Sequence, residues 1–144
     1  QRDGDLNEML LATIHNIRDK YKITEIIWHQ GEADFLTYTT AKNYVKSFHS
    51  MLETLSENKV KAPVFISIAT KCLQAGSFTW KADNPTAIGQ RQLVDNKRIF
   101  LGVDTDAILT KPDRRSPECH FSESGQLKTA MSFATAIQKA RSLN

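Results

Sequence analysis

The chain has 144 residues, of which 40% are hydrophobic and 24% charged, with only four prolines and six glycines. This composition excludes a disordered chain and predicts one domain over residues 1–144 with a single core. Lysine and arginine number 19 against 16 aspartate and glutamate residues, and the basic ones are scattered along the chain. The charge pattern therefore argues against a nucleic-acid partner.

The sequence shows no membrane segment and no targeting leader. No apolar run approaches the roughly 20 residues that span a bilayer, and no charged-then-apolar stretch opens the chain. We therefore expect a soluble protein without a membrane partner. Cys72 and Cys119 allow at most one internal disulfide, which the sequence leaves undecided. The compartment stays unknown, with secretion and the periplasm among the candidates.

The first part of the chain predicts a helix, a strand and a second helix. Apolar side chains three and four positions apart predict a helix over about residues 5–20. A short β-branched run predicts a strand over residues 24–28, which stops at a glycine-containing turn. A second helix should follow Thr40, which can cap its start, and should end near Asn58.

The second part continues the alternation of strands and helices. The expected elements are a strand at 64–69, a helix at 86–96, a strand at 98–103 and a helix at 122–142. Either Ser122 or Ser124 can cap the last helix. Residues 71–84 show no sustained period and predict a long surface loop, of the kind that often borders a site.

This order of elements predicts an α/β fold, a three-layer α/β/α sandwich in which helices cover both faces of a parallel sheet. The strand at 24–28 is apolar enough to need a neighbour on each side, because an uncovered apolar edge promotes aggregation. We therefore expect further strands from a segment upstream of Gln1, which would leave the domain of residues 1–144 incomplete at its N-terminus.

Candidate catalytic residues gather after the predicted strands, where ligands bind in open parallel sheets. They comprise His29, Gln30, Glu32, Asp34, Lys71, Cys72, Asp104, Asp106, Asp113, Glu118 and His120. A histidine base, a carboxylate that orients it and amide donors for an oxyanion are what acyl transfer requires. However, no predicted strand of the chain is followed by a small-residue turn with an exposed serine.

Two sequence blocks resemble a known family of hydrolases. Ile-Trp-His-Gln-Gly-Glu-Ala-Asp at 27–34 resembles the W-x-Q-G-E-x-D block of the carbohydrate and sialate O-acetylesterases of the SGNH-hydrolase superfamily. Cys-His-Phe-Ser at 119–122 is similar to their C-terminal C-H-F-S block. Gln92 and the run at 103–106 also stand where the family pattern expects them, so the resemblance covers about residues 5–140.

The resemblance implies hydrolysis of acetyl esters through a seryl intermediate, without a cofactor or a metal. Its serine would lie after the first strand of a five-stranded sandwich, upstream of Gln1, so the chain alone should be inactive. His120 would be the general base, Glu32 its carboxylate partner, and Gln30 or Gly31 would contact the oxyanion or the substrate. The implied partners are an acetylated carbohydrate, such as a sialic acid or xylan, and the missing N-terminal segment.

The chain departs from the family pattern at two positions. Many members of the superfamily carry an aspartate three residues before the histidine, where this chain has Pro117. Glu118 and Asp113 therefore stay open as alternative acids. An arginine usually precedes the glutamine of the third helix by one turn, but Gly89 stands near that place.

Four alternatives remain beside this interpretation. An independently expressed N-terminal fragment could reconstitute the enzyme, which would leave this chain inactive alone. The chain could be a module without a nucleophile that binds a glycan or a protein partner. The Cys72 thiol could act as the nucleophile, which no other feature of the sequence supports. A metal could also be bound by His29, Glu32, Asp34 and His120, although their spacing matches no familiar ligand pattern.

Overall fold

The computed structural model describes residues 2–72, 80–115 and 119–142, and it describes side chains from residue 8 onward. The helices and strands, in chain order, are α1 (Arg2–Arg18), β1 (Ile26–Trp28), α2 (Glu32–Leu36), α3 (Ala41–Glu57), β2 (Val64–Ile68), α4 (Pro85–Leu93), β3 (Ile99–Asp104), α5 (Thr105–Ile108), the 3-10 helix η1 (Lys111–Asp113) and α6 (Glu123–Arg141). No described helix is long and apolar enough to cross a membrane.

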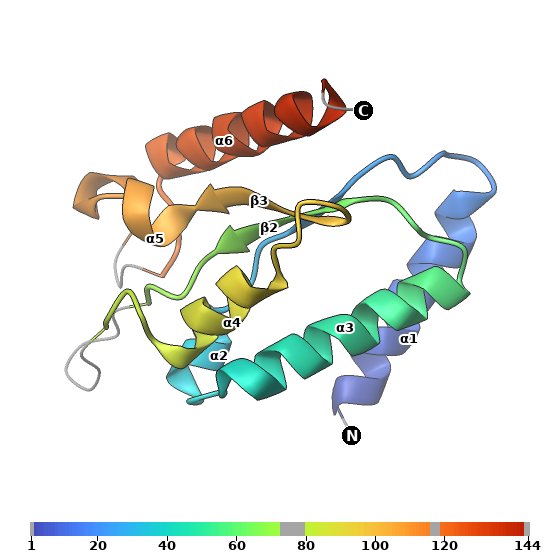
Figure 1. Ribbon diagram of the computed structural model, residues 1–144, viewed down its shortest axis with the longest axis horizontal. Coiled ribbons are helices and arrows are strands. Elements are labelled where there is room, and N and C mark those ends of the chain that lie inside the picture. The colour runs from blue at the N-terminus through green and yellow to red at the C-terminus, as the bar shows by residue number, and fades with distance from the viewer. Residues whose placement is uncertain (1, 73–79, 116–118, 143–144) are drawn as a thin grey trace.

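The sheet of the described part of the chain has three parallel strands in the order β1-β2-β3. Helix α6 covers one face, and α3 and α4 cover the other (Figure 1). The α/β sandwich predicted from the sequence is therefore confirmed. All five residues of β2 are buried, since this central strand has a neighbour on each side and helices above and below.

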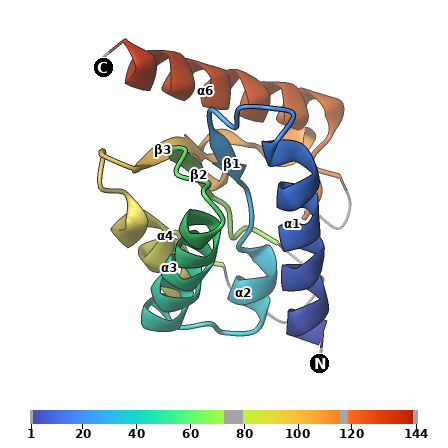
Figure 2. The same cartoon turned by 90° about the vertical axis from the view of Figure 1, so that its right-hand side faces the viewer.

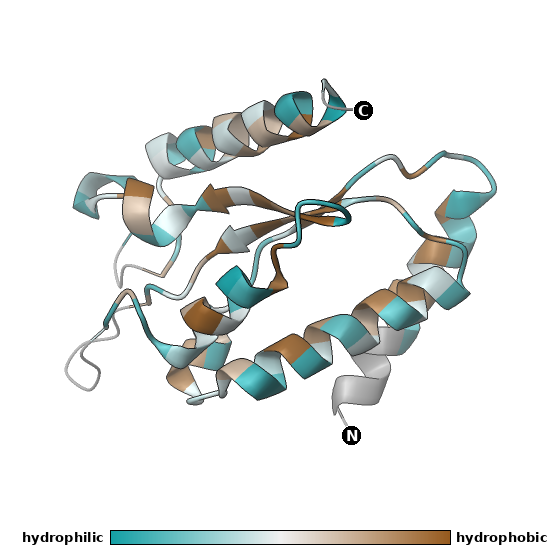
Figure 3. Ribbon diagram, viewed as in Figure 1, coloured by the Kyte–Doolittle hydropathy of each residue, from teal (hydrophilic) through white to brown (hydrophobic). Residues whose placement is uncertain are grey.

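Each face of the sheet has its own apolar core, and the hydrophobic residues concentrate between the layers (Figure 3). On one face, Tyr44, Phe48 and Leu52 of α3 pack in a cluster that includes Val64 of β2. The four-residue spacing of these three α3 side chains places them on one side of the helix. On the other face, Phe133 of α6 packs against Phe65 and Val103.

Capping side chains set several helix ends. Thr40 accepts a hydrogen bond from the Asn43 N–H at the start of α3, as predicted. Ser122 caps α6 by accepting from the Gly125 N–H, which decides between the two expected serines. Asn84 caps α4, in which Pro85 occupies the first turn.

Some predicted boundaries are wrong. The third helix ends at Leu93 rather than at 96, because the Asp95 carboxylate accepts hydrogen bonds from the N–H groups of the next turn, including that of Ile99. Asn96 adopts a positive φ of 55°, which no helix tolerates. The first strand is shorter than predicted, and α1 spans Arg2–Arg18 instead of 5–20. The short helices α2 and α5 were not predicted.

Strand β1 lies at an edge of the sheet (Figure 2). Its only partner strand in the described chain is β2, and Ile27 in its middle is 56% exposed. Beside β1 lies an apolar groove of about 470 Å³, lined on its other side by α6 residues such as Phe133 and Ile137. The groove reaches His29, so this open edge borders the end of the sheet at which candidate residues gather.

Candidate active site

Both sequence blocks meet at one pocket beyond the carboxyl end of β1. The pocket has a volume of about 600 Å³ and is lined by His29, Glu32, Ala33, Arg115, Cys119, His120, Phe121 and Gln126. His29 and Glu32 come from the first block, and Cys119 to Phe121 come from the second. The structure therefore brings His120 and Glu32, the predicted base and its predicted carboxylate partner, to the same cavity.

Within this pocket Glu32 lies beside His29. A Glu32 carboxylate oxygen lies 3.6 Å from His29 Nε2, as the three-residue spacing allows at the start of α2. The Nδ1 atom on the other side of the His29 ring lies 2.8 Å from Ser67 Oγ. His120 is exposed, and none of the described residues makes a hydrogen bond to its imidazole.

Ser67 is the described serine that contacts a histidine of this pocket. It belongs to the central strand β2 and is 0% exposed, so no substrate reaches its hydroxyl. Its oxygen also lies 3.4 Å from the Trp28 carbonyl oxygen. Ser67 therefore fixes the orientation of the His29 ring and is not a nucleophile.

The side chain of Gln30 points away from the pocket of His120. Its amide donates a hydrogen bond to the Asp34 carboxylate, and it lines a separate cavity together with Trp28 and Tyr44. Trp28 packs edge-on against Phe48, with ring centroids 5.7 Å apart, as expected of a core residue. Any contact of Gln30 with substrate in the His120 pocket would therefore have to come from its main chain.

Gly31 is required by the close approach of three segments. Its φ of 151° is a conformation that side chains disfavour. A Cβ atom there would lie 2.2 Å from Gln90 Nε2 and 2.3 Å from the Ala69 carbonyl oxygen. The glycine of the first block therefore serves the packing of the strand end.

Gln90 of α4 holds the end of β1 in place. This side chain is 0% exposed; its oxygen accepts from the Ala69 N–H at 3.0 Å, and its amide donates to the Gln30 carbonyl at 2.7 Å. Burial raises the pKa of Tyr44, so its hydroxyl stays protonated and donates to the same carbonyl at 3.3 Å. The family pattern had pointed to Gln92, which is exposed.

The helical period contains a signal for Gln90 that the sequence analysis missed. Gln90 lies three residues from both Ala87 and Leu93, which are buried, so it shares their face of α4. A polar side chain on an apolar face needs a partner, which here is the main chain of two strand ends.

Asp113, one of the two alternative acids, has a structural role. The carboxylate is buried and binds the Lys128 ammonium at 2.8 Å, the Thr110 N–H at 3.0 Å and the Ser124 hydroxyl at 2.9 Å. These hydrogen bonds, with that of Lys128 the strongest, hold the pKa of Asp113 well below its usual range. It does not line the pocket of His120. The other alternative, Glu118, and Pro117 lie outside the described residues.

The Asp113→Asn variant should lose stability mainly above pH 4. Because the folded-state pKa lies below the unfolded value of about 3.9, the unfolded chain binds the extra proton and the ionised carboxylate stabilises the fold. This contribution is complete above the unfolded pKa and disappears as pH falls toward the folded one. Urea unfolding from pH 2 to 6 should show wild type more stable than the variant at pH 6, with the gap closing below pH 4. A constant gap would contradict the assignment.

Cys72 and Cys119 form a disulfide, so neither carries a free thiol. The alternative of a cysteine nucleophile is thereby wrong. No group of three or more histidine, cysteine, aspartate or glutamate side chains in the described chain could hold a metal ion. Trp80 donates a hydrogen bond to Thr70 Oγ1 at 3.0 Å and lies under the Lys71 ammonium.

The fold and the pocket together define a class of protein. A parallel α/β sheet with a histidine and a carboxylate beyond its strand ends is a common setting for hydrolytic enzymes, although the fold alone does not specify a reaction.

A comparison with family models identifies the family within this class. The model described as carbohydrate esterase, sialic acid-specific acetylesterase, matches residues 1–139. The chain therefore belongs to this family of carbohydrate esterases, which confirms the resemblance seen in the two sequence blocks. Searches of curated proteins and of solved structures found no match.

Proposed function

We propose that residues 1–144 form the base-bearing part of a serine-type O-acetylesterase that removes acetyl groups from a carbohydrate, such as a sialic acid or xylan. The observation that carries this proposal is that His29 and Glu32 of the first block and His120 of the second line the same pocket. The two blocks are about 90 positions apart in the chain. The family supports esterase chemistry in general, and the pocket supplies the residues for it.

In this proposal His120 is the general base. It takes the proton of a serine hydroxyl as the oxygen attacks the acetyl carbonyl carbon, and it returns that proton to the sugar oxygen as the ester bond breaks. A water molecule, deprotonated by the same imidazole, then attacks the acetyl-serine; acetate is released, and the imidazolium returns the proton to the serine oxygen as the acyl bond breaks. The negative charge of Glu32 favours the imidazolium that forms in each step.

We assign the oxyanion contacts to the main-chain N–H groups of Gln30 and Gly31, at the rigid end of β1. The hydrogen bond from the Gln30 amide to Asp34 supports this choice over the side chain of Gln30. The contacts of Gln90 and Tyr44 with the Gln30 carbonyl hold this strand end in place, and catalysis requires such preorganised donors.

The nucleophilic serine would come from a segment outside residues 1–144. Two observations support this: the open edge of β1 and the apolar groove between Ile27 and α6. The groove shares His29, Phe121 and Gln126 with the pocket. A strand added along β1 would cover both the edge and the groove, and its end would reach the pocket.

The disulfide supports an oxidising compartment, because such bonds persist outside the cytosol. We therefore propose that the protein is secreted or periplasmic.

A serine-reactive probe and an acetate assay test the proposed function together. A protein that carries residues 1–144 with its upstream segment should release acetate from an O-acetylated sugar and should bind a fluorophosphonate covalently. The 144-residue chain alone should do neither, because Ser67 is buried. An inactive, unlabelled longer protein that still binds a glycan would instead support the binding module. Labelling of the isolated chain would contradict an external serine.

A further inference from the structure

The segment that carries His120 is attached to the core through Arg114. The Arg114 side chain is only 2% exposed. Its guanidinium donates to the Lys71 carbonyl at 2.9 Å and to the Thr105 carbonyl at 3.1 Å. One side chain therefore links the main chain near His120 to Lys71, which follows β2, and to Thr105, which follows β3.

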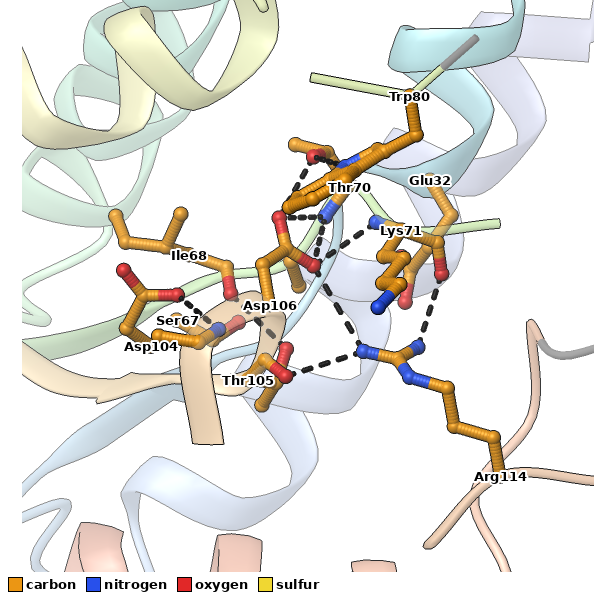
Figure 4. Close-up of polar contacts among 12 residues, drawn as sticks. Glu32, Ser67, Ile68, Thr70, Lys71, Trp80, Asp104, Thr105, Asp106 and Arg114 are labelled. Carbon is orange, nitrogen blue, oxygen red and sulfur yellow. Dashed lines mark hydrogen bonds and ion pairs between the residues drawn. The ribbon is translucent and has the colours of Figure 1, made fainter. Parts of the chain in front are cut away.

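Asp106 completes this buried network. Its carboxylate, 3% exposed, lies 3.8 Å from the Arg114 guanidinium. It accepts hydrogen bonds from the Thr70 hydroxyl at 2.6 Å and from the Lys71 N–H at 2.9 Å (Figure 4). Since a buried charge requires a partner, Arg114 and Asp106 stabilise each other. Together they bind the residues that follow β2 and β3.

Two contacts connect Arg114 to the position of His120. Arg114 pairs with Phe121 in an isolated antiparallel bridge, and the adjacent Arg115 N–H donates to the His120 carbonyl at 2.8 Å. The Phe121 ring lies with its centroid 5.1 Å from that of His29. Fixing Arg114 therefore fixes the main chain at His120 and Phe121.

The disulfide provides a second attachment to the same place. Cys119 directly precedes His120, and Cys72 directly follows Lys71, whose carbonyl Arg114 binds. The Lys71–Cys72 dipeptide thus has two attachments near His120: Arg114 binds it noncovalently, and Cys119 binds it covalently.

We propose that Arg114 is a positioning residue for His120, and that it acts in parallel with the disulfide between Cys72 and Cys119. The catalytic consequence rests on the proposed function, since it requires that His120 is the base. The structural part does not. Either tether holds the pair formed by Arg115 and His120, and the loss of both releases it. Active-site groups need placement within about 0.5 Å, which a doubly anchored segment provides.

Amide hydrogen exchange of the 144-residue chain tests the tethers without any activity. The exchange protection of the Arg115 N–H, relative to that of the core Val64 N–H, reports local opening around His120. Arg114→Lys keeps the charge beside Asp106 but loses the fork that reaches two carbonyls. We expect this variant, or reduction of the wild type, to lower the relative protection by less than about tenfold, and the reduced variant to lower it more than about a hundredfold. A folded Arg114→Gln variant should show the same changes in the relative protection of the Arg115 N–H as Arg114→Lys.

Arg141→Lys is the matched control, because Arg141 also pairs with a carboxylate, Glu25, but at the opposite end of the sheet. It should leave the relative protection of the Arg115 N–H unchanged in both redox states. The proposal is overturned if the reduced Arg114→Lys chain opens no more than reduced wild type, or if the Arg115 and Val64 amides lose protection equally, since that would indicate a general loss of stability.

A kinetic measurement on the complete esterase separates this proposal from the proposed function. Arg114→Lys under reducing conditions should lower kcat for p-nitrophenyl acetate at least tenfold, because the base is then misplaced. KM should stay nearly unchanged. If His120→Ala is active but the amide result holds, the proposed function fails and the tethering stands. If His120→Ala is inactive but the amides do not respond, the tethering fails alone.

Discussion

Replacing His120 with alanine in the complete esterase is expected to lower kcat/KM for p-nitrophenyl acetate by about 10⁴-fold. The loss is large because the same imidazole moves the proton in both acylation and deacylation. Glu32→Gln should lower kcat by about a hundredfold, since it removes the negative charge that favours the imidazolium. Both effects should appear in kcat more than in KM, because the charge develops only in the transition state.

His49→Ala is the matched control for this measurement. His49 is exposed on α3 and lines a different cavity, which also contains Arg98. Its removal should leave kcat/KM within about twofold of wild type, on the scale of a surface substitution. A His120→Ala enzyme that keeps more than a tenth of the wild-type activity would contradict the role of His120 as base.

Replacing Gln90 with leucine should destabilise the fold by about 3 kcal/mol, because the Ala69 N–H and the Gln30 carbonyl each lose a buried hydrogen-bond partner. For a chain of this size, thermal unfolding should shift down by about 10 °C. Circular dichroism melting measures this directly. The variant should also loosen the strand end that carries Gln30 and Gly31, so we expect esterase activity to fall even below the new melting temperature.

Gln92→Leu is the control for Gln90, since the two glutamines lie two positions apart on the same helix and only Gln90 is buried. Its unfolding free energy should stay within about 0.5 kcal/mol of wild type. Equal effects of the two substitutions would show that the network around Gln90 does not stabilise the end of β1.

The order and type of the main elements follow from the sequence because each periodic pattern sums over many residues. The side chains of α3 repeat every three or four positions, and the run at 64–69 is apolar apart from Ser67, so neighbouring positions support the same interpretation. Boundaries were less predictable. The end of α4 depends on a single side chain, Asp95, which turns the chain by binding its own main chain.

The sequence predicted where the two blocks lie but not which of their side chains contact each other. Both blocks were expected at the carboxyl ends of the strands, and they line one pocket. The contact between Glu32 and His29 was missed, although the two residues are only three positions apart. The short helix α2, which begins at Glu32, sets this geometry, and five residues are too few to show a period.

The sequence by itself determined the α/β fold class, the two blocks that mark the carbohydrate esterase family and the end of the sheet where they meet. These features depend on local patterns and on the general rules for parallel sheets. Only the tertiary structure decided that Cys72 pairs with Cys119, that Gln90 rather than Gln92 is buried, and that Arg114 binds the Lys71 carbonyl. Each of these contacts joins segments distant in the chain, and their relative placement is a property of the whole packed core, which no local pattern encodes.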